Sequence, residues 1–244
     1  MDLRSVREIE HSKSLAALDT ELVWGWGTPA GKIRAKRRAN LIAEGARLGP
    51  GVHALEIGCG TGMFTEMFAE TGARLVAVEI SPDLLKKTKI RKLSSGQVEF
   101  LQMHFEDYDR EGYFDAVIGS SILHHLDLIA ALSKIYNLLK PGGVISFAEP
   151  NLLNPQVFAE LRFRKWFPYV SPDETAFIHW RLKNELIKAG FEDIEVMPFD
   201  WLHPSTPELM INSVKALSSF LEKVPFLRNF AGSLYMRARR PKNR

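Results

Sequence analysis

Residues 54–62, Ala-Leu-Glu-Ile-Gly-Cys-Gly-Thr-Gly, decide the fold of this chain. The apolar start of this stretch ends in three glycines at alternate positions: Gly58, Gly60 and Gly62. A second apolar run, 75–78, ends in Glu79. Glycine lets a loop turn tightly and lets a ligand approach the backbone, and an acidic residue at the tip of the next strand can accept hydrogen bonds from ribose hydroxyls. The pattern predicts a nucleoside site at the carboxyl edge of a parallel sheet.

The glycine spacing, G-x-G-x-G with Glu56 two residues before it, differs from the G-x-G-x-x-G of dinucleotide folds. It resembles the first motif of class I S-adenosylmethionine-dependent methyltransferases. The resemblance covers 52–149 closely, including the turn at 140–143 and the strand at 114–118, and it is looser over 172–240. It implies S-adenosylmethionine as the cofactor and a small, partly apolar molecule as the methyl acceptor.

Strand-like and helix-like segments alternate along the middle of the chain, which predicts an α/β fold with a doubly wound parallel sheet and helices on both faces. The strands are expected at 53–57, 74–79, 97–102, 114–119 and 143–148, and the helices near 62–71, 82–93 and 127–139. Beyond these, a helix is expected at 172–189 and strands at 191–199 and 233–239. The resemblance adds a Rossmann-like sheet of seven strands in the order 3-2-1-4-5-7-6, with the last strand antiparallel.

We expect one structural domain in three parts. Residues 1–50 form an N-terminal helical cover, 51–150 the cofactor-binding core, and 151–244 the rest of the sheet. Two segments of the last part, 151–170 and 206–231, are long for connections between strands, and they are rich in aromatic or apolar residues. Because loops after parallel strands gather at the ligand-binding edge, we expect both to act as substrate lids, together with Trp24 and Trp26. Plain extra packing is the alternative.

The cofactor-binding residues that the resemblance implies are Glu56, Gly58, Cys59, Gly60, Gly62, Glu79, Ile80, His104, Phe105, Glu106 and Ser120. Glu56 is expected near the cofactor's ammonium and Glu79 at its ribose. His104 stands where the family often has an acidic residue for the adenine amino group. A neutral imidazole can still accept a hydrogen bond, and Glu106 is the alternative.

The catalytic candidates follow the fourth and fifth strands: His124, His125 and Glu149. A histidine here faces the transferred methyl group in many small-molecule enzymes that this segment resembles, and it can serve as a base. We expect one histidine of the pair, His124, to point into the pocket and the other to pack or bond locally. No metal is expected, because adjacent side chains diverge and no further Cys or His completes a ligand set.

Composition restricts the function classes further. The net charge is only +3, hydrophobic residues make up 45% and the single cysteine, Cys59, excludes an intramolecular disulfide. The N-terminus lacks the apolar core of a signal peptide and no 18-residue apolar run is present, so we expect a cytoplasmic protein without a transmembrane segment. Basic residues cluster at 32–38, 86–92 and 237–244, either on solvated faces or on a surface for anionic lipid or nucleic acid.

Three alternative functions remain open at this point. The first is an enzyme at the membrane surface that methylates a lipid or quinone, anchored by 206–231 in peripheral contact. A nucleic-acid methyltransferase is less favoured, because Ser120-Ser121-Ile122-Leu123 is not the Asn/Asp-Pro-Pro-aromatic run of base-methylating enzymes. A non-catalytic cofactor-binding module is motivated only by His104.

Overall fold

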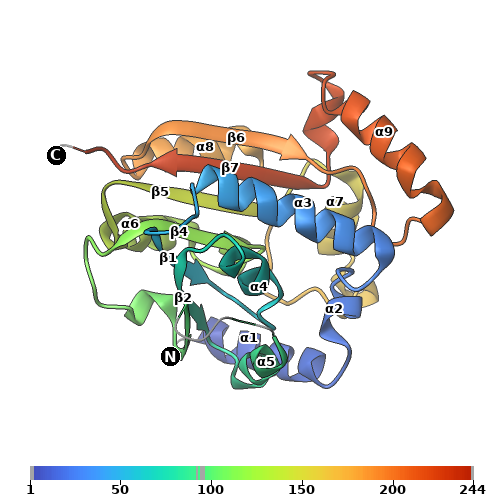
Figure 1. Cartoon of the computed structure of the whole chain (residues 1–244). Coiled ribbons are helices and arrows are strands. Elements are labelled where there is room, and N and C mark those ends of the chain that lie inside the picture. The colour runs from blue at the N-terminus through green and yellow to red at the C-terminus, as the bar shows by residue number, and fades with distance from the viewer. Residues whose placement is uncertain (1–2, 92, 94–96, 243–244) are drawn as a thin grey trace.

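The structure is a computed structural model and describes residues 3–91, 93 and 97–242. Within these residues, seven strands form one sheet in the order β3-β2-β1-β4-β5-β7-β6 (Figure 1). Strand β7 is antiparallel to both its neighbours, and the other pairs are parallel. This confirms the predicted fold class. The strands are β1 (His53–Ile57), β2 (Arg74–Glu79), β3 (Val98–Gln102), β4 (Phe114–Ser120), β5 (Leu139–Pro150), β6 (Glu192–Phe199) and β7 (Ser233–Arg239).

Helices cover both faces of the sheet (Figure 1). Helices α3 and α4 pack on one face through a core that includes Ile42 and Phe68, and α6 and α8 pack on the other through Ile135 and Leu186. The central strands β1 and β4 are buried on both faces, which is why their sequences are nearly continuous apolar runs. The helices are α1 (Leu3–Ala16), α2 (Thr20–Val23), α3 (Pro29–Gly45), α4 (Met63–Ala69), α5 (Pro82–Lys87), α6 (Leu128–Leu138), α7 (Pro155–Arg162), α8 (His179–Lys188) and α9 (Ile211–Leu221).

Two predicted helix boundaries are wrong. The helix predicted at 172–189 begins only at His179. The preceding residues instead form a loop in which both the backbone amide and the hydroxyl of Thr175 donate hydrogen bonds to the carbonyl of His124. The helix predicted at 82–93 ends at Lys87 and continues as a 3₁₀ turn to Ile90; residue 92 lies outside the described residues.

The turn at 140–143 is part of strand β5 rather than a separate connection. Helix α6 ends at Leu138, and Leu139 already pairs with Phe114. The register then shifts before Ala116 pairs with Val144, so the extra residues form a bulge.

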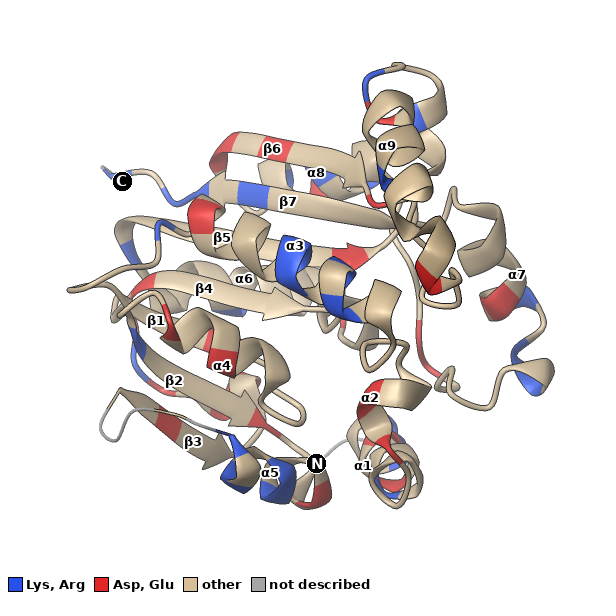
Figure 2. Ribbon diagram, turned by 45° about the vertical axis from the view of Figure 1, so that its right-hand side comes forward, with Lys and Arg blue, Asp and Glu red and all other residues tan. Residues whose placement is uncertain are grey.

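The basic residues of 32–38 mostly have partners inside the protein. Arg34 pairs with Asp200 at 2.7 Å, Arg37 pairs with Glu222 at 2.6 Å, and Arg38 is buried. Figure 2 shows the blue residues of α3 and red residues on other elements, such as α4 and β6. The arginines of α3 are therefore largely structural, which does not favour a nucleic-acid surface on this helix. The ends of the other two basic clusters, 92 and 243–244, lie outside the described residues.

None of the described helices combines the length and the apolar composition that a membrane crossing requires.

Candidate active site

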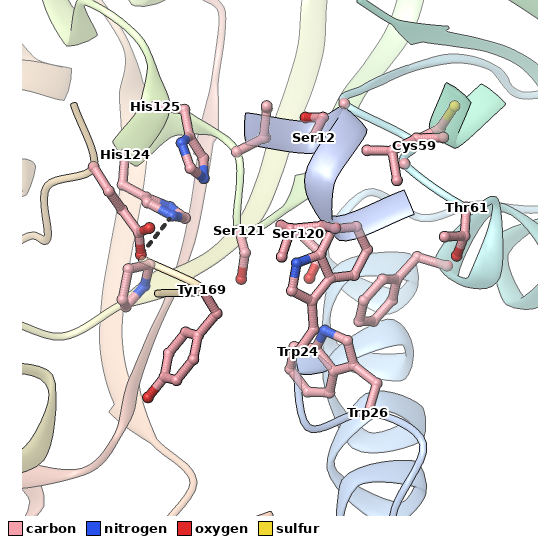
Figure 3. Close-up of a pocket in the computed structure, with 18 of the residues that line it drawn as sticks. Ser12, Trp24, Trp26, Cys59, Thr61, Ser120, Ser121, His124, His125 and Tyr169 are labelled. Carbon is pink, nitrogen blue, oxygen red and sulfur yellow. Dashed lines mark ion pairs between the residues drawn. The ribbon is translucent and has the colours of Figure 1, made fainter. Parts of the chain in front are cut away.

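A cavity of about 1090 Å³ lies at the carboxyl edge of the sheet (Figure 3). Its lining includes residues at the ends of four strands: Gly58 after β1, Glu79 of β2, Ser120 of β4 and Pro150 of β5. Its volume is slightly above the range for small-molecule sites, about 300–1,000 Å³. The cavity is therefore large enough to hold a nucleoside-sized cofactor and a second small molecule together.

Most of the sequence-predicted site residues line this cavity. They are Gly58, Cys59, Gly60, Glu79, Ile80, His104, Phe105, Glu106, Ser120, His124 and His125. Glu56, Gly62 and Glu149 do not line it. Gly62 instead begins helix α4 with a φ of +78°, and Glu149 is completely buried behind His124.

The glycine loop is held against the tip of β2 by backbone donors. The amides of Gly58 and Cys59 donate to the carbonyl of Val78. The amide of Gly60 donates to Glu79 Oε2 at 2.9 Å, and the amide of Ser81 donates to Glu79 Oε1 at 2.8 Å. A carboxylate has about four acceptor sites, so Glu79 can still accept from a further donor. Burial raises the pKa of Glu79, although these amides oppose the shift.

Two buried groups near the loop are not suited to react with a substrate. Burial raises the pKa of the Cys59 thiol well above its ordinary value, so a thiolate nucleophile is not favoured. Burial also raises the pKa of Glu56 to about 8, and its Oε2 atom is buried with no hydrogen-bond partner. At neutral pH, Glu56 is therefore mainly a neutral carboxyl group inside the protein.

His104 supplies an unused polar atom at the side of the cavity predicted for adenine. Its Nε2 atom is buried with no hydrogen-bond partner, and its Nδ1 atom lies 4.0 Å from a carboxylate oxygen of Glu106. An unsatisfied buried nitrogen is costly unless a ligand pairs with it. Phe105 beside it is buried and supplies an apolar wall.

Arg38 is a cavity-lining residue that the sequence analysis treated only as part of a basic cluster. Its guanidinium donates to Ser121 Oγ at 2.8 Å, the carbonyl of Ala148 at 3.0 Å and Ser233 Oγ at 2.7 Å. Burial, with a contribution from the nearby Arg34, lowers its pKa to about 10, so it stays charged at neutral pH. Arg38 Nε has no hydrogen-bond partner. The cavity thus contains a fixed positive charge below the tips of β4, β5 and β7.

His124 is buried and forms a short hydrogen bond with Glu149. Its Nδ1 atom lies 2.7 Å from Glu149 Oε2, while Glu149 Oε1 accepts from the amides of Ile122 and Leu123. Burial opposes charge on the imidazole, but Glu149 and Glu174 outweigh it and raise the pKa of His124 to about 9. His124 is therefore mainly protonated at neutral pH without a ligand.

His125 also lines the cavity, and it pairs locally with Glu8 at 3.2 Å. The His124 and His125 ring centroids lie 4.2 Å apart, and Figure 3 shows both rings on the side of the pocket away from Cys59 and Thr61. Sequence reasoning missed two carboxylates beside them, Glu8 of α1 and Glu174 of the loop before α8. Hydrogen bonds and charge from the histidines lower the pKa of both carboxyls against the effect of burial.

The two expected lid segments differ in position. Segment 151–170 contributes cavity-lining residues, but of its five aromatic residues only Tyr169 is among them. Segment 206–231 contributes none, and the wall there comes from 201–205. Trp24 and Trp26 both line the cavity, and Figure 3 shows them next to each other. Trp24 lies over the glycine loop, since a Cβ atom on Gly60 would be 3.4 Å from its ring.

A methyltransferase-domain family matches residues 55–145, which contain the glycine loop and β4. A ubiquinone biosynthesis O-methyltransferase of Xanthomonas axonopodis pv. citri is 35% identical over 141 residues. That match covers 56% of this chain and 59% of the relative's length. Residues 55–145 thus resemble a methyltransferase domain, and the chain spans about three fifths of the length of the curated relatives it matches.

Solved structures agree with this fold. The N-methyltransferase NodS of Bradyrhizobium japonicum WM9, in complex with S-adenosylhomocysteine, superposes with a TM-score of 0.64 at 17% identity. The match covers 96% of this chain and 98% of NodS. The [4+2]-cyclase SpnF superposes with a TM-score of 0.59 at 20% identity, covering 84% of this chain and 80% of that one. Because a cyclase shares the fold, the class I methyltransferase fold does not by itself fix a reaction.

Proposed function

We propose that this chain is a class I methyltransferase that transfers a methyl group from S-adenosylmethionine to an O, N or C atom of a small, partly apolar molecule. One observation carries the proposal. The glycine loop with Glu79 and the polar cluster around His124 line the same cavity. A nucleoside cofactor and an acceptor bound there would lie side by side.

The polar atoms of the cavity fit the cofactor. Glu79 has free lone pairs for ribose hydroxyls, and His104 Nε2 is an unpaired partner for the adenine edge. Arg38 is a buried cation near Ser120, where the cofactor's carboxylate would be stabilised. Glu56 does not reach the cavity surface, so its role would be to shape the loop from behind.

The protein contributes to the reaction mainly by aligning the acceptor with the methyl group and by excluding water. The bound cofactor supplies a sulfonium whose methyl carbon is open to in-line displacement. Well-oriented reactants gain up to about 7–11 kcal/mol over a free encounter. Trp24, Trp26 and Tyr169 would form the apolar wall that keeps the acceptor aligned.

The test is binding followed by turnover. Purified protein should bind S-adenosylhomocysteine in calorimetry. A panel of phenols, catechols, amines and short quinols should then be screened by mass spectrometry for a product with one added methyl group. No binding of the sulfur ligand would reject the proposal, whereas binding with no product from any acceptor class would favour a reaction other than methylation.

A second candidate, methylation of a quinone or lipid at a membrane surface, is favoured by one observation. The 206–231 segment exposes six large apolar side chains: Leu209, Met210, Leu217, Phe220, Phe226 and Leu227. Co-sedimentation with phosphatidylglycerol vesicles tests it, comparing Phe220→Glu with Ile129→Glu, an equally exposed position on α6. Loss of binding only in Phe220→Glu supports peripheral membrane contact; equal binding by both rejects it. The cytoplasmic location expected from the sequence stays a prediction.

A further inference from the structure

The adjacent histidines face the same point in the cavity, contrary to the expectation that neighbouring side chains diverge. They lie on a 3₁₀ turn, Leu123–His125, that follows Ser121, whose φ is +56°. This left-handed backbone is uncommon for a residue other than glycine, and such backbones cluster at functional sites. The turn brings the two rings to a centroid separation of 4.2 Å with a tilt of 40°.

Each imidazole has a nitrogen at ion-pair distance from a carboxylate. His124 Nε2 lies 3.6 Å from Glu174 Oε1. His125 Nδ1 is buried and lies 3.2 Å from Glu8 Oε2. One ligand atom each from His124, His125 and Glu174 can be chosen so that all lie within 4.8 Å of one another.

These separations suit a cation between the groups. Zinc–nitrogen and zinc–oxygen distances are about 2.0–2.2 Å. With both arms at about 2.1 Å, the 3.6 Å separation between His124 Nε2 and Glu174 Oε1 corresponds to an angle of about 120° at the metal, which is close to the tetrahedral value.

The atoms behind the four side chains hold them in this orientation. Glu149 binds Nδ1 of His124 at 2.7 Å, so Nε2 is the atom that faces the cluster. A carboxylate behind a histidine is the usual outer partner of a metal ligand. On the carboxylate side, Ser171 fixes both groups: its amide donates to Glu174 Oε2 at 3.0 Å, and its hydroxyl donates to Glu8 Oε1. One oxygen of each carboxylate is thus left to face the histidines.

We propose that His124, His125 and Glu174 bind a divalent zinc-like cation at the acceptor end of the cavity, with Glu8 beside His125. Imidazole with carboxylate is a ligand set that suits zinc. The role of the site rests on the proposed function: an acceptor oxygen that coordinates the ion would have its pKa lowered and its position fixed. The acceptor class would then be a hydroxyl or phenol, and His124 would position the metal rather than accept the proton.

Cobalt(II) is a suitable probe, because its visible absorption reports inner-sphere ligands in a zinc site. Full-length protein is treated with a chelator, desalted and titrated with Co²⁺, and Zn²⁺ is then added. The site predicts intense visible bands at one Co²⁺ per chain, and their loss on addition of Zn²⁺. His125→Ala and Glu174→Gln should each weaken Co²⁺ binding by about ten-fold or more. His124→Ala is less informative, since this residue is buried and its loss leaves Glu149 unpaired.

His203→Ala is the matched control. It lines the same cavity but bonds to Gln156 and Ser205 rather than to the cluster, so it should bind Co²⁺ like the wild type. Absence of visible bands in the wild type overturns the proposal, as does unchanged Co²⁺ affinity in both His125→Ala and Glu174→Gln. S-adenosylhomocysteine binding is measured on the chelated protein. If S-adenosylhomocysteine binds but Co²⁺ does not, only the proposed metal site is rejected. If Co²⁺ binds but S-adenosylhomocysteine does not, only the proposed cofactor is rejected.

Discussion

The Gly60 amide donates a hydrogen bond of 2.9 Å to the carboxylate of Glu79, and this contact joins the glycine loop after β1 to the tip of β2. The acidic residue therefore has two functions in the proposed site. It fixes the loop, and its remaining lone pairs face the position of a ribose. Because one side chain serves both functions, changes at either residue should affect cofactor binding more than they affect folding.

Gly60→Arg should abolish binding of S-adenosylhomocysteine. Gly60 has a φ of +55°, and the side chain would enter the space between the loop and Trp24. Gly112→Arg is a control with the same backbone penalty, since Gly112 has a φ of +59° but has open space around it and does not line the cavity. Calorimetry of both variants separates the two effects. If Gly60→Arg and Gly112→Arg bind S-adenosylhomocysteine equally well, the ligand does not lie against the glycine loop.

Glu79→Ala should weaken S-adenosylhomocysteine binding by about ten-fold to a hundred-fold, because two ribose hydrogen bonds, each contributing about 0.5–1.5 kcal/mol, are lost. Asp83→Asn, a nearby change at a partly exposed position in the first turn of α5 outside the cavity lining, should have no effect. Titration calorimetry gives both affinities. A Glu79→Ala variant that folds normally and binds as tightly as wild type would contradict the ribose contact.

Arg38→Met should destabilise the protein by about 2–4 kcal/mol. The substitution removes donors from Ser121, Ser233 and the carbonyl of Ala148, which remain buried or partly buried. The neighbouring Arg37→Met should cost only about 1 kcal/mol or less, since its ion pair with Glu222 is partly exposed. Urea unfolding of the two variants measures the difference. If Arg38→Met and Arg37→Met lose similar amounts of stability, the hydrogen bonds of Arg38 to the strand ends do not contribute to folding as argued.

Glu56→Gln should change how stability depends on pH. The folded pKa of about 8 lies above the ordinary value of 4.5, so the unfolded chain releases the proton first as pH rises. The contribution of Glu56 to stability is thus complete below pH 4.5 and is lost progressively up to about pH 8. The free energy of unfolding of wild type, relative to Glu56→Gln, should fall by a few kcal/mol across this window. Glu70→Gln, at an exposed position, should show no such pH-dependent difference from wild type. If the difference in unfolding free energy between wild type and Glu56→Gln does not change with pH, the raised pKa of Glu56 is wrong.

The sequence was sufficient to predict the sheet and one half of the site. Strand ends and the glycine loop are encoded locally, by apolar runs and by residues such as Gly60 that need a positive φ. The carboxylates beside the predicted histidines were not predicted. Glu8 and Glu174 come to the histidines at the tip of β4 from the first helix and from a loop before α8, and no local pattern records such long-range contacts.

Arg38 was missed for a related reason. A helix with five basic residues in seven normally presents them to solvent, so the pattern at 32–38 indicated a solvated face or an anionic partner. The structure instead buries Arg38 beneath Trp26 and the strand tips. Tertiary packing of α3 on the sheet, rather than the composition of α3, decides the environment of this residue.

Equilibrium dialysis of the wild-type protein against labelled S-adenosylmethionine, with and without excess NAD, tests the central claim most directly. We predict one bound equivalent with micromolar affinity, displaced by S-adenosylhomocysteine and unaffected by NAD. No bound label on protein that unfolds cooperatively, or displacement of the label by NAD, would contradict the assignment of this cavity as a methyl-donor site.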